Sequence, residues 1–328
     1  AGHIWKFVTL AYIPPTIAGV VLAYRKKYLL GGIITALFIA LQIQSNHIQM
    51  SYYFMFVILF FVGAYFEDAY KKKELPHFFK ASGVLALAAV VGVCINISNL
   101  YHTYEYSKET MRGKSELKQE GAAASQTSSG LDRDYITNWS YGIGETFSLL
   151  VPNVKGGASV PLSRSEKAME KANPMYSSLY SQLTQYFGDQ PMTSGPVYVG
   201  AFVLMLFILG CFIVKGPMKW ALLGATIFSI LLSWGKNFMG LTDFFIDYIP
   251  MYNKFRAVSS ILVIAEFTIP LLAILTLKEI LTKPELLKEK LKYIYISFGL
   301  TGGLALLFAI APRLFFPTYI PGNEMAAL

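Results

Sequence analysis

The stretch DYIPMYNKFRAVSSILVIAEF, residues 247–267, combines a helix breaker, two cations and an acid within one predicted membrane crossing. A proline ends the segment before it, and Lys254 and Arg256 precede an apolar helix that we expect over 257–277. Glu266 lies inside that helix. A carboxylate in a spanning helix is costly, so it usually faces a bundle interior or a watery cavity. The stretch therefore predicts a spanning helix with a polar opening at one end.

Composition places the whole chain in the membrane class. Of its 328 residues, 54% are hydrophobic and 15% are charged, and the mean hydropathy is +0.46. An ordinary soluble domain carries about 25% charged residues. The formal net charge of +8 does not predict a nucleic-acid partner, because basic residues in membrane proteins gather in cytoplasmic loops. Cys94 and Cys211 both lie in apolar runs, which predicts neither a disulfide nor a metal site.

Apolar segments predict an all-α fold, a polytopic transmembrane helix bundle that forms a single domain over residues 1–328. We expect about eight spans, at 4–24, 28–43, 52–66, 78–97, 196–214, 220–234, 257–277 and 293–311. The second and third are shorter than the ~20 residues of a straight crossing. They should therefore tilt or end in a polar turn.

Basic residues in the short loops predict the orientation. They gather in alternate loops, at 25–27, 71–80, 215–219 and 278–292. The positive-inside rule places these loops in the cytoplasm and both ends of this chain outside it. The sequence opens with AGHIW, has no signal-peptide features and already enters an apolar helix. We therefore expect a piece of a longer chain, with at least one crossing upstream.

One long connection, 99–195, is expected outside the cytoplasm. Its first part has helical spacing of aromatic residues and predicts an interfacial helix that continues the fourth span. The small, polar run 121–130 predicts a mobile lid or linker. Asn173 and Pro174 then begin a predicted amphipathic helix. The stripe of that helix would consist of Tyr176, Tyr180, Leu183 and Phe187. Long loops of this kind are usually functional or disordered, and the aromatic content here favours function.

Two groups of residues could bind an anionic substrate at the membrane surface. Asn46, His47 and Gln49 form a polar tip between the second and third segments. Histidine is uncommon so near the bilayer, although any such hairpin needs polar residues. Lys254 and Arg256 could hold a phosphate, or could extend to lipid headgroups. Both readings of each group stay open.

Three carboxylates complete the candidates. Glu266 could line a cavity or bond to a neighbouring helix as a structural contact. Glu145, in YGIGETF, and Asp189, in YFGDQP, could hold sugar hydroxyls or act as a base, although solvated acids are the ordinary state in loops. The sequence has no Walker loop, GxSxG, HExxH or cysteine–histidine ligand spacing. No cofactor or metal ligand is therefore predicted, and a need for a divalent metal is left open.

Four phrases of the sequence together resemble one protein family. They are SNHIQMSYY (45–53), NWSYGIGETFSLLVPN (138–153), YFGDQPMTSGPVYVG (186–200) and IPMYNKFRAVSSILVIAEF (249–267). These phrases resemble the YfhO family of bacterial membrane proteins, over nearly the whole chain. That family is similar to a branch of the GT-C glycosyltransferases, multi-span enzymes that move a sugar from a polyprenyl-phosphate carrier to an acceptor outside the cytoplasm.

The resemblance implies a glycosyltransferase of the bacterial cytoplasmic (inner) membrane. Its partners would be the lipid bilayer, a lipid-linked sugar as donor, and a cell-envelope polymer or glycolipid as acceptor, with no nucleic acid. In GT-C enzymes the key acid commonly follows the first span, which would lie upstream of residue 1. Within this chain, Glu145 and Asp189 are the catalytic candidates. The alternatives are a transporter or flippase of lipid-linked saccharide and a non-catalytic membrane assembly subunit.

Overall fold

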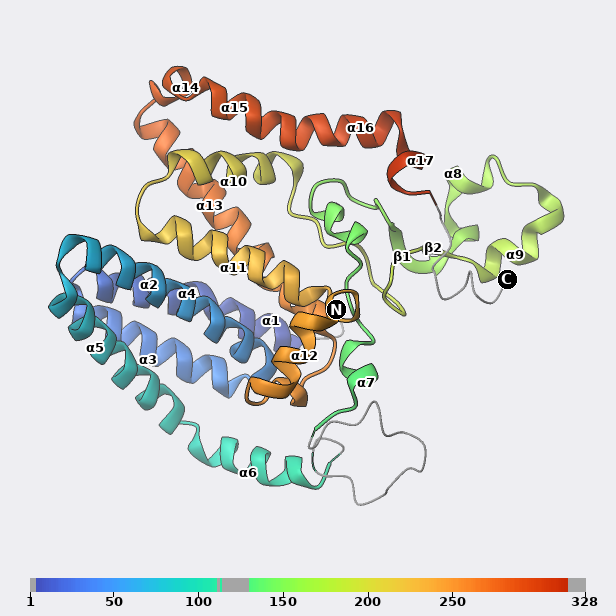
Figure 1. Cartoon of the computed structure of the whole chain (residues 1–328). Coiled ribbons are helices and arrows are strands. Elements are labelled where there is room, and N and C mark those ends of the chain that lie inside the picture. The colour runs from blue at the N-terminus through green and yellow to red at the C-terminus, as the bar shows by residue number, and fades with distance from the viewer. Residues whose placement is uncertain (1–3, 111–112, 114–129, 318–328) are drawn as a thin grey trace. The chain divides into compact units, whose positions relative to one another are not determined.

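The computed structural model describes residues 4–110, 113 and 130–317, and the fold is mostly helical (Figure 1). Five of the described helices are long and apolar enough to cross a membrane, and a sixth span results if two helices joined by a sharp bend are counted as one. Two shorter apolar helices accompany them. The prediction of a helical, multi-pass membrane protein is therefore confirmed in its coarse form. The count of eight spans stays a prediction.

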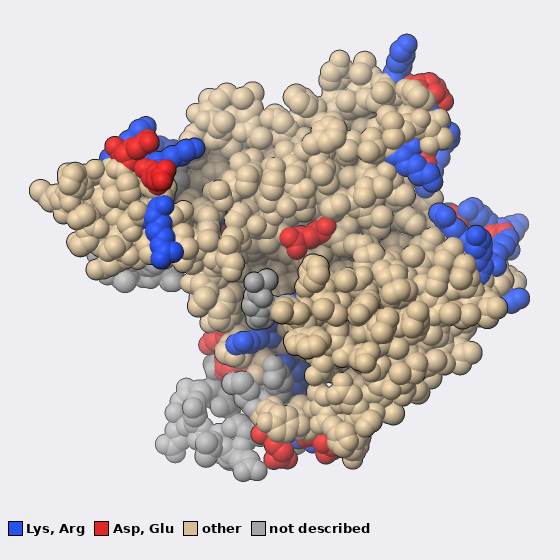
Figure 2. Space-filling view, turned by 180° about the vertical axis from the view of Figure 1, so that it is seen from behind, with Lys and Arg blue, Asp and Glu red and all other residues tan. Residues whose placement is uncertain are grey.

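The surface of the molecule fits helices that face lipid. Large apolar side chains are exposed on several spans, and Leu87, Leu281 and Ile310 are 66%, 72% and 73% exposed. Figure 2 shows charged side chains gathered in separate groups, with broad uncharged surface between them. Charges are rare on lipid-facing surface because they are costly to bury in hydrocarbon.

The chain divides into two compact units. Unit 1 comprises Ala1–Asp132 with Lys215–Ile227, and unit 2 comprises Arg133–Val214 with Phe228–Leu328. The second boundary falls inside α11 (Pro217–Ser233), so this helix contributes to both units.

Besides its part of α11, the described residues of unit 1 form six helices that run from blue to teal in Figure 1. They are α1 (Ile4–Ala11), α2 (Ile13–Tyr24), α3 (Tyr28–Gln44), α4 (Ile48–Lys72), α5 (Leu75–Cys94) and α6 (Ile97–Lys108). At 17 residues α3 is short, as expected, but α4 has 25 residues, so the prediction of a short third segment is wrong. Polar residues at both ends of the apolar core continue the α4 helix. The predicted helix after the fourth span is α6, and its place at the membrane interface stays a prediction.

Small residues bring α2 and α3 together. A Cβ placed on Gly31 would lie 2.5 Å from the backbone nitrogen of Ala23, and one on Gly19 would lie 2.9 Å from that of Thr35. In lipid, helices attract each other mainly through such close van der Waals packing. On its other side α3 contacts α5, so α3 is central to unit 1.

Unit 2 contains the remaining apolar helices. They are α10 (Ala201–Ile213), α13 (Val263–Thr282), α15 (Leu291–Phe298) and α16 (Leu304–Ile310), with α12 (Met239–Tyr248), α14 (Leu286–Glu289) and α17 (Pro312–Phe315) beside them. A π-helical turn, Gly299–Gly303, joins α15 and α16 into one candidate span. Helix α10 packs against α13 and α15.

Two predicted spans in unit 2 begin later than expected. The fifth begins at Ala201, because residues 196–200 are non-helical and Gly200 has a φ of +99°. The seventh does not begin as an α-helix at Ala257, which is left-handed with a φ of +58°. A 3-10 helix, Val258–Leu262, follows and leads into α13. In both places the backbone breaks the helix where the sequence is still apolar.

The predicted sixth span bends sharply at its end. Helix α11 and the segment Gly235–Tyr248, which contains α12, meet at an angle of 108°. Gly235 has a φ of +43°, and a Cβ there would lie 2.6 Å from the Val258 side chain. Glycine therefore permits both the turn and the close contact. The bend places a short polar segment between two apolar helices.

The long connection carries short elements, including a sheet that the all-α prediction omitted. They are α7 (Arg133–Thr137), the 3-10 helices η1 (Gly144–Leu149), η2 (Leu162–Arg164) and η3 (Pro174–Tyr176), α8 (Glu166–Met169), α9 (Ser177–Gln182), β1 (Gly156–Pro161) and β2 (Thr184–Tyr186). The strands pair antiparallel, with Gly156 opposite Tyr186. Of the predicted linker 121–130, residues 121–129 lie outside the described part of the chain.

The predicted amphipathic helix of this connection is wrong in its second half. Asn173 caps the start as expected, because its side-chain oxygen accepts a hydrogen bond from the Met175 N–H at 3.0 Å. Helix α9 then ends at Gln182, and the next residues form β2. Leu183 and Phe187 therefore lie on no helical stripe. Pairing with β1 decides the conformation here, and local periodicity cannot report that partner.

Candidate functional site

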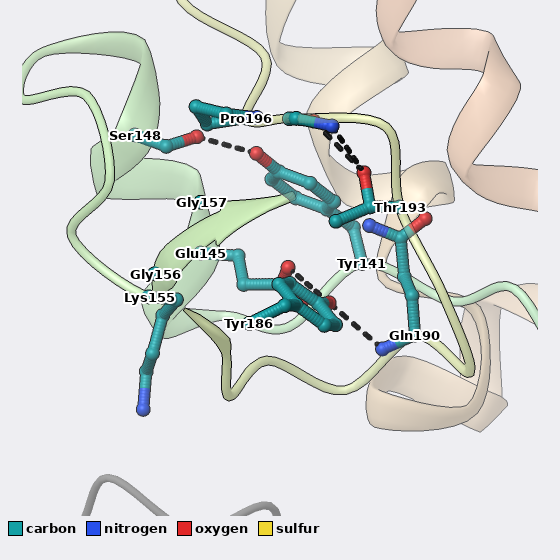
Figure 3. A pocket seen from close by; sticks show the side chains of 11 residues that line it. Tyr141, Glu145, Ser148, Lys155, Gly156, Gly157, Tyr186, Gln190, Thr193 and Pro196 are labelled. Atoms are coloured by element: carbon teal, nitrogen blue, oxygen red, sulfur yellow. Dashed lines mark hydrogen bonds between the residues drawn. The ribbon is translucent and has the colours of Figure 1, made fainter. Parts of the chain in front are cut away.

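Glu145 is the buried centre of a polar cluster in unit 2. It lies in the first turn of η1, and only 4% of it is exposed. Its carboxylate accepts a hydrogen bond from the Tyr186 hydroxyl at 2.5 Å (Figure 3). It also accepts hydrogen bonds from the Gly142 N–H at 2.6 Å and the Asp189 N–H at 3.2 Å. A buried carboxylate is stable only when such bonds replace its water shell. Two segments of the connection, 142–145 and 186–189, therefore meet at one side chain.

Two glycines allow these segments to approach each other. A Cβ on Gly142 would lie 2.8 Å from Asp189 Oδ2 and 2.9 Å from Glu145 Oε2. A Cβ on Gly188 would overlap the Glu145 carboxylate and the Tyr186 hydroxyl. The glycines in YGIGE and YFGD therefore serve close packing around the carboxylate.

Asp189 lies next to Glu145 but is exposed. Its Oδ2 accepts a hydrogen bond from Asn237 Nδ2 at 3.0 Å, and its backbone carbonyl accepts one from Lys236 Nζ at 3.1 Å. Asn237 also donates to the Tyr141 carbonyl at 3.0 Å. Within the described residues, Asp189 Oδ1 has no hydrogen-bond partner. The result is an oriented carboxylate with one oxygen open to solvent.

Tyr141 and Ser148 continue the polar cluster away from Asp189. The two hydroxyl oxygens are 2.5 Å apart, and Ser148 donates its proton to the Val197 carbonyl at 2.9 Å. The Tyr141 hydroxyl must therefore donate to Ser148. Burial raises the pKa of the Tyr141 phenol to about 12, and the negative charge of Glu145 adds to the rise. Burial and the same charge also raise the pKa of Tyr186. Both phenols are neutral donors near pH 7.

These residues line a small pocket (Figure 3). Its lining consists of Tyr141, Glu145, Ser148, Lys155, Gly156, Gly157, Tyr186, Gln190, Thr193, Gly195 and Pro196. The pocket has room for about one water molecule. It can therefore accept a hydroxyl group but not a whole sugar ring, which would have to lie outside it.

Arg256 lies against two aromatic rings of the connection. Its guanidinium carbon is 5.4 Å from the centre of the Tyr135 ring and 5.9 Å from that of Trp139, and Nη1 donates to the Tyr135 hydroxyl at 2.5 Å. Planar guanidinium groups favour such stacking. Two residues before it, burial lowers the pKa of Lys254. Aromatic contacts therefore hold Arg256 in a defined place.

Ser259 links the segment that contains Lys254 and Arg256 to the segment that contains Asp189. Its backbone N–H donates to the Trp139 carbonyl at 3.0 Å, and its hydroxyl donates to Gln190 Oε1 at 3.1 Å. Gln190 directly follows Asp189 in the chain. One amide at the start of the spanning segment is thus already occupied, which leaves fewer free N–H groups there than a bare helix start offers.

Glu266 lies in the first turn of α13. The side chain is exposed, and within the described residues it has no hydrogen bond or ion pair. Its negative charge makes only the smallest contribution to the raised pKa of the Tyr141 phenol. Pro270 lies four residues later and has no N–H for the Glu266 carbonyl. The carboxylate and the backbone carbonyl of Glu266 thus lie where the hydrogen-bond ladder of α13 lacks one bond.

Asn46, His47 and Gln49 belong to unit 1, not to the unit that contains the other candidates. Asn46 and His47 form the turn between α3 and α4, where Asn46 has a φ of +57°. Asparagine tolerates this left-handed conformation better than most residues. Gln49 Nε2 donates to the Tyr53 hydroxyl at 2.9 Å. The tip therefore has a structural role as a turn, and its substrate role stays a prediction.

Sequence reasoning did not assign a site role to Lys236, Asn237 or Tyr186. The signal for the first two was a glycine followed by polar residues, WGKN, directly after an apolar span. No local signal marks Tyr186 as the partner of Glu145, because the two are 41 residues apart. Among the described residues there is no group of three or more histidine, cysteine, aspartate or glutamate side chains that could hold a metal ion.

Comparison with known proteins adds no further restriction on the function. No protein-family model, no curated protein and no solved structure matches this chain.

Proposed function

We propose that this protein is a membrane glycosyltransferase of the GT-C type, related to the YfhO family. It would take a sugar from a polyprenyl-phosphate carrier and transfer it to a cell-envelope polymer or glycolipid outside the cytoplasm. In this proposal the chain crosses the bacterial cytoplasmic membrane eight times, with both ends of this chain outside. The observation that carries the proposal is the exposed Asp189 carboxylate, oriented by Asn237 and held beside the buried Glu145.

The two carboxylates have different roles in this proposal. Asp189 is the candidate catalytic base, because Oδ1 is open and can accept a proton from the acceptor hydroxyl. The hydroxyl oxygen then bonds to the anomeric carbon, and the bond from that carbon to the phosphate oxygen breaks. Glu145 is a positioning residue, because its oxygens are occupied and it fixes the Asp189 backbone.

Arg256 is the candidate group for the leaving phosphate. A guanidinium stabilises developing phosphate charge through paired hydrogen bonds. Stacking on Tyr135 and Trp139 holds it in place before substrate binds, which lowers the ordering cost of binding. Ser259 links its segment to the Asp189 segment, so base and cation belong to one connected site.

A transporter or flippase of lipid-linked saccharide is the alternative that one observation favours. Glu266 is an exposed, unpaired carboxylate on a candidate span, within the described residues. Such residues often mark a substrate or ion path through the membrane. A transporter would move the lipid-linked sugar without breaking the anomeric bond, so product analysis distinguishes the two functions. A non-catalytic assembly subunit would do neither.

Substitution of Asp189 tests the catalytic role. Asp189→Asn keeps the shape and the bond to Asn237 but removes the basic oxygen, so transfer from a polyprenyl-phosphate sugar should fall by about 10²–10⁴-fold. Donor binding should change little. Glu170→Gln, an exposed acid in the same connection, is the matched control and should keep full activity. Full activity of Asp189→Asn would show that the base is elsewhere, for example upstream of residue 1.

Substitution of Arg256 tests the phosphate site separately. Arg256→Ala should weaken donor binding by about 1.5–3 kcal/mol, the typical worth of a charge-assisted hydrogen bond. Arg256→Lys should recover only part of this loss, because an ammonium cannot make the paired contact. If both variants fold and bind the donor as tightly as the parent protein, Arg256 only anchors its segment.

A further inference from the structure

Two turns lie side by side at one end of unit 1. One, residues 25–27, connects α2 to α3, and the other, residues 73–74, connects α4 to α5. Lys26 Nζ and Glu74 Oε1 join them at 3.2 Å. The ends of four helices, three of which belong to candidate membrane spans, therefore meet at one place.

An aromatic cluster holds these turns together. Tyr24 stacks on Tyr65 and Phe78, with ring centres 4.5 Å and 5.6 Å apart. His77 Nε2 bonds to the Tyr24 carbonyl at 2.9 Å, and His77 Nδ1 to the Tyr28 hydroxyl at 2.6 Å. Since a carbonyl can only accept, Nε2 donates to it, and in the neutral imidazole Nδ1 accepts from Tyr28. The backbone that carries the charged residues is thus fixed.

Cations outnumber acids at this end. Seven cations, Arg25, Lys26, Lys27, Lys71, Lys72, Lys73 and Lys80, accompany three acids, Glu67, Asp68 and Glu74. Three lysines form ion pairs with these acids: Lys26, Lys71 and Lys72. Within the described residues, the other four cations form no ion pair, and all four are exposed. Four positive charges therefore remain available to a partner.

We propose that this basic end of unit 1, defined by Lys27, Lys73 and Lys80, binds the phosphate headgroups of anionic phospholipids. Lys80 Nζ lies 4.7 Å from the centre of the Tyr28 ring, which places an ammonium beside an amphipathic aromatic residue. Tyrosine and lysine at the end of a spanning helix are the residue types that occupy the headgroup level of a bilayer.

The position of these lysines favours a lipid over a soluble anion. Lys27 and Lys73 lie on turns at the ends of apolar helices, Lys80 lies in the second turn of α5, and all three are exposed. A free phosphate would stay largely hydrated there and gain little. A lipid headgroup is held in the same plane by its acyl chains, so several weak charge contacts add up. The proposal does not depend on the sugar-transfer activity or on the orientation of the chain.

Lipid selectivity in nanodiscs tests the proposal. The full chain is reconstituted in mixtures of phosphatidylcholine and phosphatidylglycerol, and lipids that stay bound after release are measured by native mass spectrometry. The parent protein should retain phosphatidylglycerol preferentially. In the triple variant Lys27→Gln, Lys73→Gln, Lys80→Gln, the preference for phosphatidylglycerol over phosphatidylcholine should fall about tenfold. The matched control Arg164→Gln, Lys167→Gln, Lys171→Gln removes the same charge from the connection in unit 2 and should keep it.

Any of the following results would overturn the proposal. The parent protein could show no preference, or the control could lose as much as the triple variant, which would mean that only total charge matters. Inorganic phosphate could displace phosphatidylglycerol better than chloride at equal ionic strength, which would make free phosphate the ligand. If the triple variant does not fold, the single variant Lys80→Gln replaces it, and an unchanged preference in that variant would also count against the proposal.

Discussion

Unit 1 and the connection in unit 2 are held together by different kinds of contact. In unit 1, small residues such as Gly19 and Gly31 let apolar helices touch, and the ion pairs lie on exposed ends. In the connection, a buried carboxylate, Glu145, accepts hydrogen bonds from residues up to 44 positions away in the chain. The first kind of contact depends on shape and the second on exact hydrogen-bond partners. The two regions should therefore respond differently to substitution.

The largest effect is expected at Glu145. Glu145→Ala leaves the Tyr186 hydroxyl and the N–H groups of Gly142 and Asp189 without their acceptor, which should cost about 3–5 kcal/mol of unfolding free energy. Hydrogen exchange measured by mass spectrometry should accelerate in peptides over 141–150 and 184–190. The α2 and α3 peptides of unit 1 should keep their protection. Glu170→Ala, an exposed acid of the same connection, is the control and should change neither region.

Unchanged exchange at 141–150 in Glu145→Ala would contradict the comparison. It would show that water replaces the carboxylate at little cost, and that the polar cluster does not determine the fold of the connection.

The contrast between the units also decides what the sequence could predict. Length and apolar composition are local properties, so the helical segments and the position of the long connection could be predicted. The bend at Gly235 and the late start of α13 depend on contacts with distant residues, such as that between Gly235 and Val258. The same holds for β2, where the sequence predicts a helix but the segment forms a strand because it pairs with β1.

The candidate site was predictable in its residue types but not in its connections. Glu145 and Asp189 could be chosen because each lies among glycines and aromatic residues. That Asp189 is open while Glu145 is buried depends on hydrogen bonds from Asn237 and Tyr186, and no local signal pairs Tyr186 with Glu145. Long-range hydrogen bonds decide which acid can act as a base.

The second effect concerns alkaline pH. The folded pKa of Tyr141 is raised to about 12 from an ordinary value of 10.0, so the stability it contributes is complete below pH 10 and is lost as pH rises through 12. The loss should be roughly 2–3 kcal/mol. Thermal unfolding between pH 9 and 12 measures it, and Tyr141→Phe should flatten the curve in this range. An equally steep curve in the variant would assign the loss to other residues.

The third effect tests packing in unit 1. Gly31→Ala forces α2 and α3 apart, because the new methyl group meets the Ala23 backbone, and should cost about 1–3 kcal/mol. Gly83→Ala in α5 is the matched control. A Cβ there has no atom within 4 Å, so the higher helix propensity of alanine should make this change neutral or stabilising. Unfolding in detergent mixtures measures both variants. Equal effects would mean that close approach does not hold these helices together.

The smallest effects concern the ion pairs of the two regions. In unit 1 the Lys71 and Glu67 side chains are 70% and 57% exposed, so water screens their attraction, and a double-mutant cycle should give below about 0.5 kcal/mol. In unit 2 Arg133 is only 23% exposed, and its Nη2 contacts both oxygens of Asp247 at 2.7 Å. This paired geometry should give a coupling of about 1 kcal/mol. High salt should lower this coupling less than it lowers the coupling between Lys71 and Glu67. If the coupling in unit 1 is the larger, exposure does not govern these pairs, and the contrast between the two units does not extend to their ion pairs.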